Sequence, residues 1–330
     1  MTLESLEGPL SWSGTWRDRI LGGMLGLAVG DALGLPWEFR RGDEIEWEFT
    51  GDMVGGGTWG MPPGTWSDDT AQALALIDTL VSEGPDPRAF LERLLEWYRL
   101  GKYTVDGMVF DIGFTTRRAL EAFESGVPPE RAGARVPSCG GLMRCFPIPV
   151  YTLCDRLETA LDVAHRMCAA THAHPVAMMA CGLYTIIVRG VFAGLSLRDA
   201  VAAAGEAVDK IYSSGEWAGY ARRFRYLESV ERLASERPEE AECEASKMLR
   251  AALWSVLSTD SFEEALVNAV KLGGDTDTVA AIAGSIAGAY YGVNAIPSRW
   301  LSKLRGRSLV EEAAHRLAST LKARCGERHY

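Results

Sequence analysis

The chain has 330 residues, of which 47% are hydrophobic and 24% are charged, so it is long enough to bury a large core. Lysine and arginine together number 34 and aspartate and glutamate 44, giving a formal net charge of −10. An acidic chain without a basic run argues against nucleic acid as a partner.

Helical periodicity runs through most of the chain and predicts an all-α protein. The predicted helices span residues 16–33, 68–83, 87–100, 112–125, 155–170, 174–192, 196–212, 217–235, 243–258, 261–271, 277–292 and 309–323. Residues 44–58 differ, because the alternation Glu46-Trp47-Glu48-Phe49 ahead of glycines is typical of a β-hairpin. We expect a short N-terminal extension over residues 1–15, without a signal peptide, and one compact multi-helix domain over residues 16–330.

Glycines recur every four residues in the first predicted helix and in the helix predicted over residues 277–292. The two stripes are Gly22, Gly26, Gly30 and Gly34, and Gly284, Gly288 and Gly292. A glycine inside a helix costs about 1 kcal/mol relative to alanine, a cost that makes sense where another backbone approaches closely. We therefore expect both helices to be central and closely packed, and the two stripes to be candidates for a mutual contact.

The most apolar stretch, residues 279–296, approaches the length of a membrane span. It is rich in small residues and opens on two aspartates, which favours a buried helix in a protein without a membrane partner. Seven scattered cysteines without a CxxC pair favour buried thiols in a reducing compartment. We therefore expect a cytoplasmic protein, as a monomer or a weak dimer.

Two short acidic clusters are the most informative part of the chain. One is Ser67-Asp68-Asp69-Thr70, behind a Gly-Thr-Trp turn, and the other is Gly273-Gly274-Asp275-Thr276-Asp277-Thr278. Each precedes a helix-forming run, where oxygen side chains often act as simple N-caps. Closely spaced aspartates beside hydroxyls and glycines are also the ligands that hard cations such as Mg²⁺ prefer. Spacing alone leaves both interpretations open, two independent caps or one shared dinuclear site.

Further polar residues stand among apolar neighbours. Asp31 ends the first glycine helix, Glu38 follows it, and Asp111 lies between Phe110 and Ile112. An isolated carboxylate beside Phe and Ile, such as Asp111, is a functional group or, more commonly, a helix N-cap.

A histidine pair and a glycine loop complete the set of candidates. His172 and His174 precede Pro175, a spacing that suits an extended turn with the rings pointing apart, so we do not expect them to share a metal. A lone histidine is more often a structural hydrogen-bonding group than a catalyst. The loop from Ser138 to Arg144 contains two glycines whose backbone amides can face a phosphate, although such loops are common.

These segments, in this order, resemble the ADP-ribosylglycohydrolase family, which includes the dinitrogenase reductase-activating glycohydrolase and the ADP-ribosyl-acceptor hydrolases. The matching segments are Gly30-Asp31-Ala32-Leu33-Gly34 with Glu38, Gly64 to Thr70, Phe110-Asp111-Ile112-Gly113, Cys139 to Arg144, Thr171-His172 with His174-Pro175, and Gly273 to Thr278. Together they cover nearly the whole chain, and the two acidic clusters are the specific part of the match.

The resemblance implies an all-helical fold around a dinuclear centre of two Mg²⁺ or Mn²⁺ ions. The implied metal ligands are Ser67, Asp68, Asp69, Asp275, Asp277 and Thr278. The implied ADP-ribose contacts are Asp111, Gly113, Gly140, Gly141 and His172, and the implied catalytic carboxylates are Asp69, Asp111 and Glu38. One departure concerns Cys139, which stands where the family usually has asparagine in a Gly-Asn-Gly loop.

The implied activity is metal-dependent hydrolysis of the glycosidic bond between ADP-ribose and an acceptor. The first expectation for the acceptor is an arginine side chain of an ADP-ribosylated protein, with serine, a nucleobase or a small molecule as alternatives. Carboxylates would stabilise positive charge at the anomeric carbon, and one of them would activate water. Arg144 or loop amides are candidates to face the pyrophosphate, and Tyr212 or Trp217 to stack on adenine.

Two other classes of function remain as alternatives. A non-catalytic ADP-ribose-binding or crystallin-like structural protein has no need of six metal-binding oxygens. A dinuclear-metal phosphoesterase would release phosphate from simple esters. Residues 36–62, with Trp37, Trp47 and Trp59, are a candidate lid over the site or a surface excursion with aromatic side chains tucked into the core.

Overall fold

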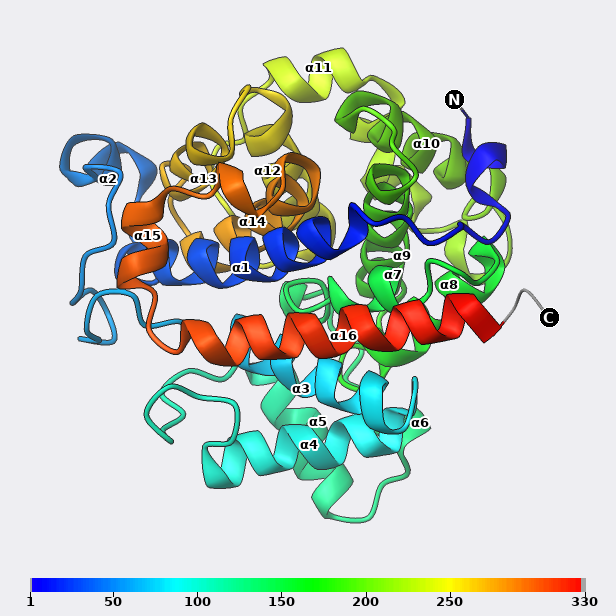
Figure 1. Cartoon of the computed structure of the whole chain (residues 1–330), viewed down its shortest axis with the longest axis horizontal. Coiled ribbons are helices and arrows are strands. Elements are labelled where there is room, and N and C mark those ends of the chain that lie inside the picture. Colours follow the sequence, from blue (N-terminus) through cyan, green and yellow to red (C-terminus); the bar gives the residue numbers. More distant parts are fainter. Residues whose placement is uncertain (1, 328–330) are drawn as a thin grey trace.

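The computed structural model describes residues 2–327, and helices form almost all of its regular structure (Figure 1). Over these residues no β-strand is present, and the β-type contacts are isolated bridges. The expected all-α class is therefore confirmed.

The helices follow one another in a single series along the chain. The α-helices are α1 (Trp16–Gly34), α2 (Gly42–Glu48), α3 (Asp68–Ser82), α4 (Pro87–Leu100), α5 (Phe114–Glu124), α6 (Pro129–Ala132), α7 (Pro147–Tyr151), α8 (Leu157–Ala169), α9 (Pro175–Phe192), α10 (Leu197–Lys210), α11 (Val230–Ser235), α12 (Ala245–Leu257), α13 (Phe262–Val270), α14 (Thr276–Tyr291), α15 (Ser298–Lys303) and α16 (Arg307–Glu327). The 3-10 helices are η1 (Leu3–Leu6), η2 (Leu35–Trp37), η3 (Cys139–Gly141), η4 (Gly215–Trp217), η5 (Ala221–Glu228) and η6 (Val293–Ala295).

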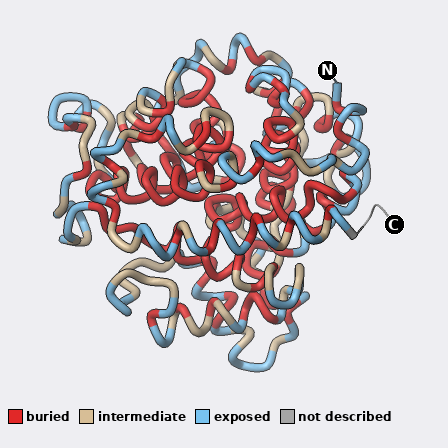
Figure 2. Tube along the Cα trace, in the orientation of Figure 1, coloured by how far each residue is buried: buried red, intermediate tan, exposed pale blue. Residues whose placement is uncertain are grey.

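Helices α1 and α14 pack side by side in the middle of the molecule, where buried residues gather (Figures 1 and 2). Their glycine stripes face each other. A Cβ added at Gly26 would lie 2.1 Å from the backbone oxygen of Gly284, and one added at Gly30 would lie 2.0 Å from that of Ala280. Side chains larger than hydrogen would hold the two backbones apart, so the predicted contact between the stripes is confirmed.

The antiparallel packing of α1 and α14 sets the position of the two acidic clusters. At the C-terminal end of α1, the Thr276 hydroxyl donates a hydrogen bond of 2.9 Å to the Gly34 carbonyl. The N-terminus of α14, with the second cluster, therefore lies against the end of α1 that carries Asp31. Helix α3, which begins within the first cluster at Asp68, also packs on both helices.

Two helical stretches have the length and apolar composition of a membrane span, Trp16–Trp37 and Pro175–Phe192. Their apolar windows are 89% and 94% buried inside the protein. Buried core helices of soluble proteins have the same character, so these two stretches alone are weak support for a membrane-spanning role.

The predicted hairpin at residues 44–58 is wrong, because the segment begins with helix α2. Ile45 is fully buried and Phe49 is 7% exposed, whereas Trp47 between them is 90% exposed. A spacing of four between buried residues belongs to a helix, and the short alternation in the sequence disguised it. Helices α6, α7 and α15 are too short for periodicity to reveal, and the helix predicted over residues 217–235 is divided into η4, η5 and α11.

The expectation of buried thiols is correct for three cysteines and wrong for four. Cys145, Cys168 and Cys181 are buried free thiols, whereas disulfides join Cys139 to Cys243 and Cys154 to Cys325. The partners are 104 and 171 residues apart, a separation that gives no local sequence signal. Because disulfides persist mainly in oxidising compartments, the cysteines no longer support the cytoplasmic location, which stays a prediction.

The residues before α1 contact the helical body. Leu3 and Leu6 are buried, and the Leu6 carbonyl accepts a hydrogen bond of 2.9 Å from Arg189 in α9. The expected boundary between an extension and a domain at residue 16 stays a prediction.

Candidate functional site

The two acidic clusters meet in space. The Ser67 hydroxyl lies 3.2 Å from Oδ2 of Asp69 and 3.4 Å from Oδ2 of Asp277. From the second cluster, the Thr278 hydroxyl lies 3.5 Å from Oδ2 of Asp69. Four of the six predicted metal ligands thus form one connected group of oxygen atoms between the N-termini of α3 and α14.

The side chains at the starts of α3 and α14 do not act as caps. Ser67 and Asp275 occupy the N-cap positions, but neither side chain makes a capping hydrogen bond with the described residues. Asp31, which reaches across from α1, binds the backbone amides at the start of α3 instead. It accepts hydrogen bonds from the amides of Ser67 (2.8 Å) and Thr70 (3.0 Å) and from the Thr70 hydroxyl (2.6 Å). The interpretation of the clusters as two simple caps is therefore wrong at these positions.

Asp31 was absent from the predicted site. It is fully buried, and one of its carboxylate oxygens lies within 4.8 Å of a ligand atom of Asp69 and of one of Asp277. Burial raises the pKa of its carboxyl to about 6, against the opposing effect of its hydrogen bonds from Thr70 and Ser67. The signal that could have found Asp31 is a carboxylate inside an otherwise apolar glycine-rich helix.

The carboxylates at the centre carry an electrostatic cost that a cation would relieve. Asp69 and Asp277 are each 1% exposed, and burial together with neighbouring carboxylates raises the pKa of both well above the usual value. Oδ1 of Asp69 is buried without a hydrogen-bond partner among the described residues. Burying unpaired carboxylates is costly unless a cation compensates, so this donor set fits a hard divalent metal.

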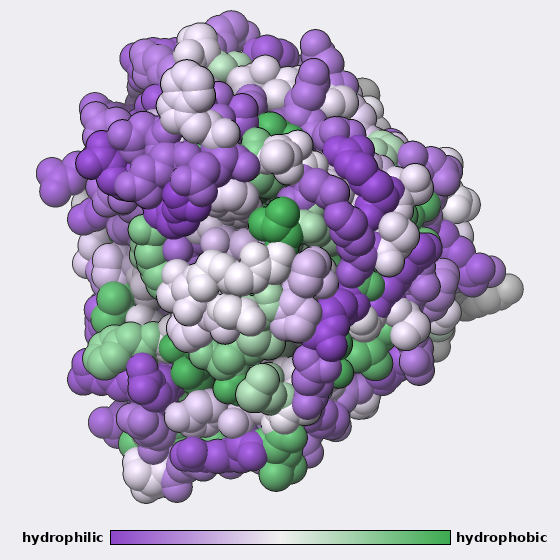
Figure 3. All heavy atoms as spheres, turned by 90° about the vertical axis from the view of Figure 1, so that its left-hand side faces the viewer, coloured by the Kyte–Doolittle hydropathy of each residue, from purple (hydrophilic) through white to green (hydrophobic). Residues whose placement is uncertain are grey.

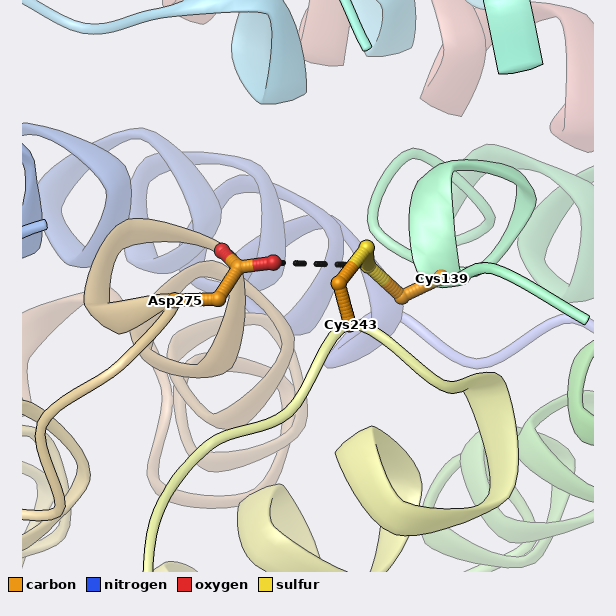
Figure 4. Close-up of side chains that lie close together, drawn as sticks. All are labelled: Cys139, Cys243 and Asp275. Atoms are coloured by element: carbon orange, nitrogen blue, oxygen red, sulfur yellow. Dashed lines mark hydrogen bonds between the residues drawn. A yellow bond between two sulfur atoms is a disulfide. The ribbon is translucent and has the colours of Figure 1, made fainter. Parts of the chain in front are cut away.

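Asp68 and Asp275 lie at the edge of this group. Asp68 accepts a hydrogen bond of 2.8 Å from Gln72 and another from the amide of Gly113, a predicted substrate-binding residue. Asp275 is half-buried, and its Oδ2 lies 3.5 Å from the sulfur of Cys139 (Figure 4). Both carboxylates are near the central group, and their roles as metal ligands stay predictions.

Glu38 and Asp111 form a second group with Asp277, in which ligand atoms of all three lie within 4.8 Å of one another. Glu38 is 6% exposed and accepts a hydrogen bond of 2.5 Å from Nε1 of Trp59. Burial, with smaller contributions from Asp111 and Asp275, raises the pKa of Glu38 to about 8. Burial and Asp275 raise the pKa of Asp111 to about 6.

The commoner interpretation of Asp111 as an N-cap is wrong, because Gly113 holds that position in α5. The segment after Glu38 is also unusual. Phe39 has a φ of 67°, which is rare for a residue with a side chain, and its amide donates a hydrogen bond of 2.8 Å to the Gly274 carbonyl. This contact fastens Glu38 to the loop that carries Asp275.

The predicted glycine loop lies on His172. A Cβ added at Gly140 would lie 2.8 Å from Nε2 of His172, and one added at Gly141 would lie 2.6 Å from the sulfur of Cys168. His172 is 1% exposed, and burial, helped by the charge of Arg144, lowers its pKa well below the usual value, so the ring is neutral. The predicted loop residues and His172 are thus brought together.

His174 has a different role, as the spacing predicted. It is the N-cap of α9, and its Nδ1 accepts a hydrogen bond of 3.2 Å from the amide of Val176. The structural role expected of a lone histidine is confirmed for this residue.

The suggestion that Arg144 faces a pyrophosphate is wrong. Arg144 is 1% exposed, and its guanidinium donates to Oε1 of Gln72 and, over 2.5 Å, to the Thr171 hydroxyl. The same hydroxyl lies 2.7 Å from Nδ1 of His172. A buried chain of polar contacts therefore connects Asp68 with the histidine under the glycine loop.

The suggested adenine platform is also not supported. Tyr212 is fully buried and its hydroxyl lies 2.9 Å from Nε2 of His165, so the ring has no free face for a nucleotide. Trp217 packs against the same histidine, with ring centroids 4.8 Å apart.

The three tryptophans of residues 36–62 have three different environments. Trp37 is buried, Trp47 is exposed on α2, and Trp59 contacts Glu38. Figure 3 looks onto this side of the molecule, where hydrophilic residues flank a central area of near-neutral hydropathy. Neither the lid nor the surface excursion describes the whole segment, and the role of a lid stays a prediction for the part that contains Trp59.

Comparison with known proteins identifies the family of this chain. The family model described as ADP-ribosylglycohydrolase matches residues 13–327. The chain therefore belongs to the ADP-ribosylglycohydrolase family, and the expected glycohydrolase class is confirmed.

Individual relatives cover most of the chain. The chain is 33% identical to the ADP-ribosylarginine hydrolase Tri1 of Serratia proteamaculans (strain 568), over 91% of this chain and 79% of that protein. It is 31% identical to the ADP-ribosyl-[dinitrogen reductase] glycohydrolase of Rhodospirillum rubrum, over 94% of this chain and 97% of that protein. A solved structure described as an ADP-ribosylglycohydrolase-related protein complex superposes with a TM-score of 0.78 and 35% identity, over 93% of this chain and 99% of that chain.

Proposed function

We propose that this protein hydrolyses the bond between ADP-ribose and an arginine side chain, in a reaction that requires Mg²⁺ or Mn²⁺. The observation that carries the metal requirement is the buried carboxylate group around Asp69, with an oxygen that lacks a partner among the described residues. The arginine acceptor is supported by the similarity to the Tri1 hydrolase of Serratia proteamaculans, whose name gives ADP-ribosylarginine as its substrate.

The proposed metal ligands are Ser67, Asp68, Asp69, Asp275, Asp277 and Thr278. Two ions held there would supply positive charge that binds the ribose hydroxyls and polarises water. The described contacts support Ser67, Asp69, Asp277 and Thr278 most directly, because these four already share one oxygen network.

We assign proton transfer to Glu38 and Asp111. Asp69, the third catalytic candidate, has the hydroxyls of Ser67 and Thr278 around one oxygen and is better suited to hold a cation. In the metal-free protein, burial raises the pKa of Glu38 to about 8 and that of Asp111 to about 6, so Glu38 holds its proton more tightly. On this order we assign Glu38 to donate a proton to the departing acceptor and Asp111 to accept one from the attacking water.

The substrate would lie between these carboxylates and the glycine loop. Gly113, where an added Cβ would meet nothing within 4 Å, leaves its backbone open to a ligand, whereas Gly140 and Gly141 pack on neutral His172 and on Cys168, which hold the loop in place. The exposed side chains of Phe39 and Phe114, each next to a predicted site residue in the chain, would offer an apolar rim to the acceptor.

The test is a panel of arginine-, serine- and nucleotide-linked ADP-ribose substrates, each incubated with Mn²⁺, with Mg²⁺ or with a chelator. We expect free ADP-ribose from the arginine-linked substrate and only when a metal is present. Release of ADP-ribose from only the serine- or the nucleotide-linked substrate would show that the acceptor is not arginine. Phosphate release from simple esters would indicate a phosphoesterase, and ADP-ribose binding without turnover would indicate a non-catalytic binder.

A double variant, Asp68→Asn with Asp277→Asn, checks the proposed ligands. It should lose both metal binding and turnover, whereas Asp162→Asn, on the exposed surface of α8, should keep both. Full activity in the double variant would contradict the dinuclear proposal.

A further inference from the structure

We propose that the Cys139–Cys243 disulfide is a reversible redox-modification site that controls metal and ADP-ribose binding. This inference rests on the proposed function, because it concerns the loops that would hold the metal and the nucleotide. Cys139 opens η3, the glycine loop, and Cys243 lies just before α12. Figure 4 shows their bond beside Asp275, a proposed metal ligand.

The disulfide joins the last two of four chain segments that lie side by side. Gly274 exchanges two hydrogen bonds of 2.8 Å with residues 39 and 40, which follow Glu38. On its other side, Ala241 donates to the Gly273 carbonyl over 3.1 Å and accepts from the Asp275 amide over 2.9 Å. The next contact joins residues 244–245 to 137–138, where the Ala245 amide donates to the Pro137 carbonyl over 2.8 Å.

This series connects both sides of the proposed site. It runs from Glu38, through the Asp275 loop and residues 241–245, to the glycine loop under which His172 lies. The backbone contacts between neighbouring segments are few, so the covalent bond between the last two segments restrains their separation more strongly than those contacts do.

The two sulfur atoms differ in access to solvent. Cys243 is exposed, whereas Cys139 is 1% exposed. A thiolate reductant can therefore reach the sulfur of Cys243, and Cys139 is the leaving group. In the second disulfide, Cys154 and Cys325 are 5% and 4% exposed, so it is protected from the same attack.

With a dithiol as the reductant, the exchange is balanced. One thiolate of the dithiol attacks Sγ of Cys243, a new sulfur–sulfur bond forms, and the Cys139–Cys243 bond breaks with its electron pair on Cys139, which takes a proton from water. The second thiolate of the dithiol then attacks its own sulfur in the mixed disulfide and releases Cys243. The protein gains two electrons and two protons, and the dithiol becomes a disulfide.

Reduction changes what Asp275 contacts. In the disulfide, the sulfur of Cys139 carries no proton, and Oδ2 of Asp275, 3.5 Å away, keeps its lone pairs for a cation. In the reduced protein, the Cys139 thiol can donate a hydrogen bond to that oxygen and compete with the metal. The glycine loop also loses its covalent restraint. We therefore expect the reduced protein to bind both the metal and ADP-ribose more weakly than the oxidised protein does.

The experiment measures binding in defined redox states. Metal-free protein is prepared oxidised and after mild dithiothreitol treatment, and differential alkylation with mass spectrometry records the state of each cysteine. Calorimetry then measures Mn²⁺ binding alone and ADP-ribose binding at saturating Mn²⁺. We expect the Kd for Mn²⁺ to be about twofold higher in the reduced protein, because a thiol is a weak donor whose hydrogen bond lies at the low end of the usual net range.

Two variants provide the control. Cys243→Ser should bind as the reduced protein does, whatever the redox treatment. Cys325→Ser, which removes the other disulfide, should keep the redox response. If the Cys139–Cys243 bond is opened and both states bind metal and ADP-ribose with equal affinity, the redox inference is overturned. It is also overturned if that disulfide is not found in the oxidised protein. Neither result affects the proposed function. Absence of metal and ADP-ribose binding in every state would overturn both.

Discussion

Replacing Asp69 by asparagine should stabilise the metal-free protein while abolishing its response to metal. The Asp69 carboxylate is buried, its Oδ1 has no hydrogen-bond partner among the described residues, and its carboxylate neighbours include Asp31 and Asp68. Asparagine has nearly the same shape and keeps an oxygen for the hydroxyls of Ser67 and Thr278, but it carries no charge.

The magnitude follows from the burial of that carboxylate. An unpaired buried charged group costs at least about 1–3 kcal/mol; asparagine removes that charge, and its amide can donate a hydrogen bond to a neighbouring carboxylate, so the free energy of unfolding without metal should rise by about that amount. At about 2 °C per kcal/mol for a chain of this size, Tm should rise by about 2–6 °C. In wild-type protein, a metal at a thousand times its Kd adds about 4.1 kcal/mol, which the variant should not gain. The order of stability should therefore reverse when metal is added.

Thermal unfolding followed by circular dichroism, in chelator and in excess Mn²⁺, measures both effects. Asp162→Asn on α8 is the matched control, since Asp162 is exposed and pairs with Arg166. It should leave Tm and the metal response close to wild type. An Asp69→Asn variant that is less stable than wild type in chelator, or that gains as much from Mn²⁺, would refute the reasoning.

Three further predictions address packing, pH and the buried cation. Gly26→Ala should lower the free energy of unfolding in denaturant titrations by about 1–3 kcal/mol, because its Cβ would overlap the backbone of α14. The control Gly326→Ala, which has open space around it, should not lower that free energy. Equal stabilities of the two variants would contradict the close packing of α1 on α14. Because burial raises the pKa of Glu38 to about 8, the protonated carboxyl stabilises the metal-free fold, and Tm should fall as pH rises from 7 to 9. This range lies above the pH at which buried neutral histidines such as His172 affect stability, and a flat profile there would contradict the shift. Arg144→Met should lower the free energy of unfolding by about 2–3 kcal/mol in the same titrations, because the buried acceptors on Gln72 and Thr171 lose their donor. An unchanged denaturation midpoint would argue against this chain of buried polar contacts.

The sequence was sufficient for the features that repeat or cluster locally. Periodicity predicts most of the long helices. The glycine stripes predict the contact between α1 and α14, because glycine destabilises a helix and its repetition at helical spacing is best explained by the close approach of another backbone. The acidic clusters were recognisable because each concentrates oxygen ligands within a few residues, as at Asp275 and Asp277.

Features that depend on contacts between residues far apart in the chain could not be predicted from the sequence. Nothing near Cys139 indicates Cys243, and nothing near Arg144 indicates that its charge is buried between Gln72 and Thr171. In each case the deciding contact joins residues separated by at least 27 positions in the chain. The hairpin predicted at residues 44–58 failed for another reason, since a short alternating run fits a strand and one turn of a helix equally well.

The central claim is that hydrolysis of ADP-ribosylarginine depends on metal held by the two acidic clusters. The most direct measurement titrates metal-stripped protein with Mn²⁺ and records bound metal and the rate of free ADP-ribose release in the same samples. We predict no release without metal and a rate that reaches its maximum at two bound ions per chain. Full turnover by the stripped protein, or metal binding that leaves the rate unchanged, would contradict the proposal.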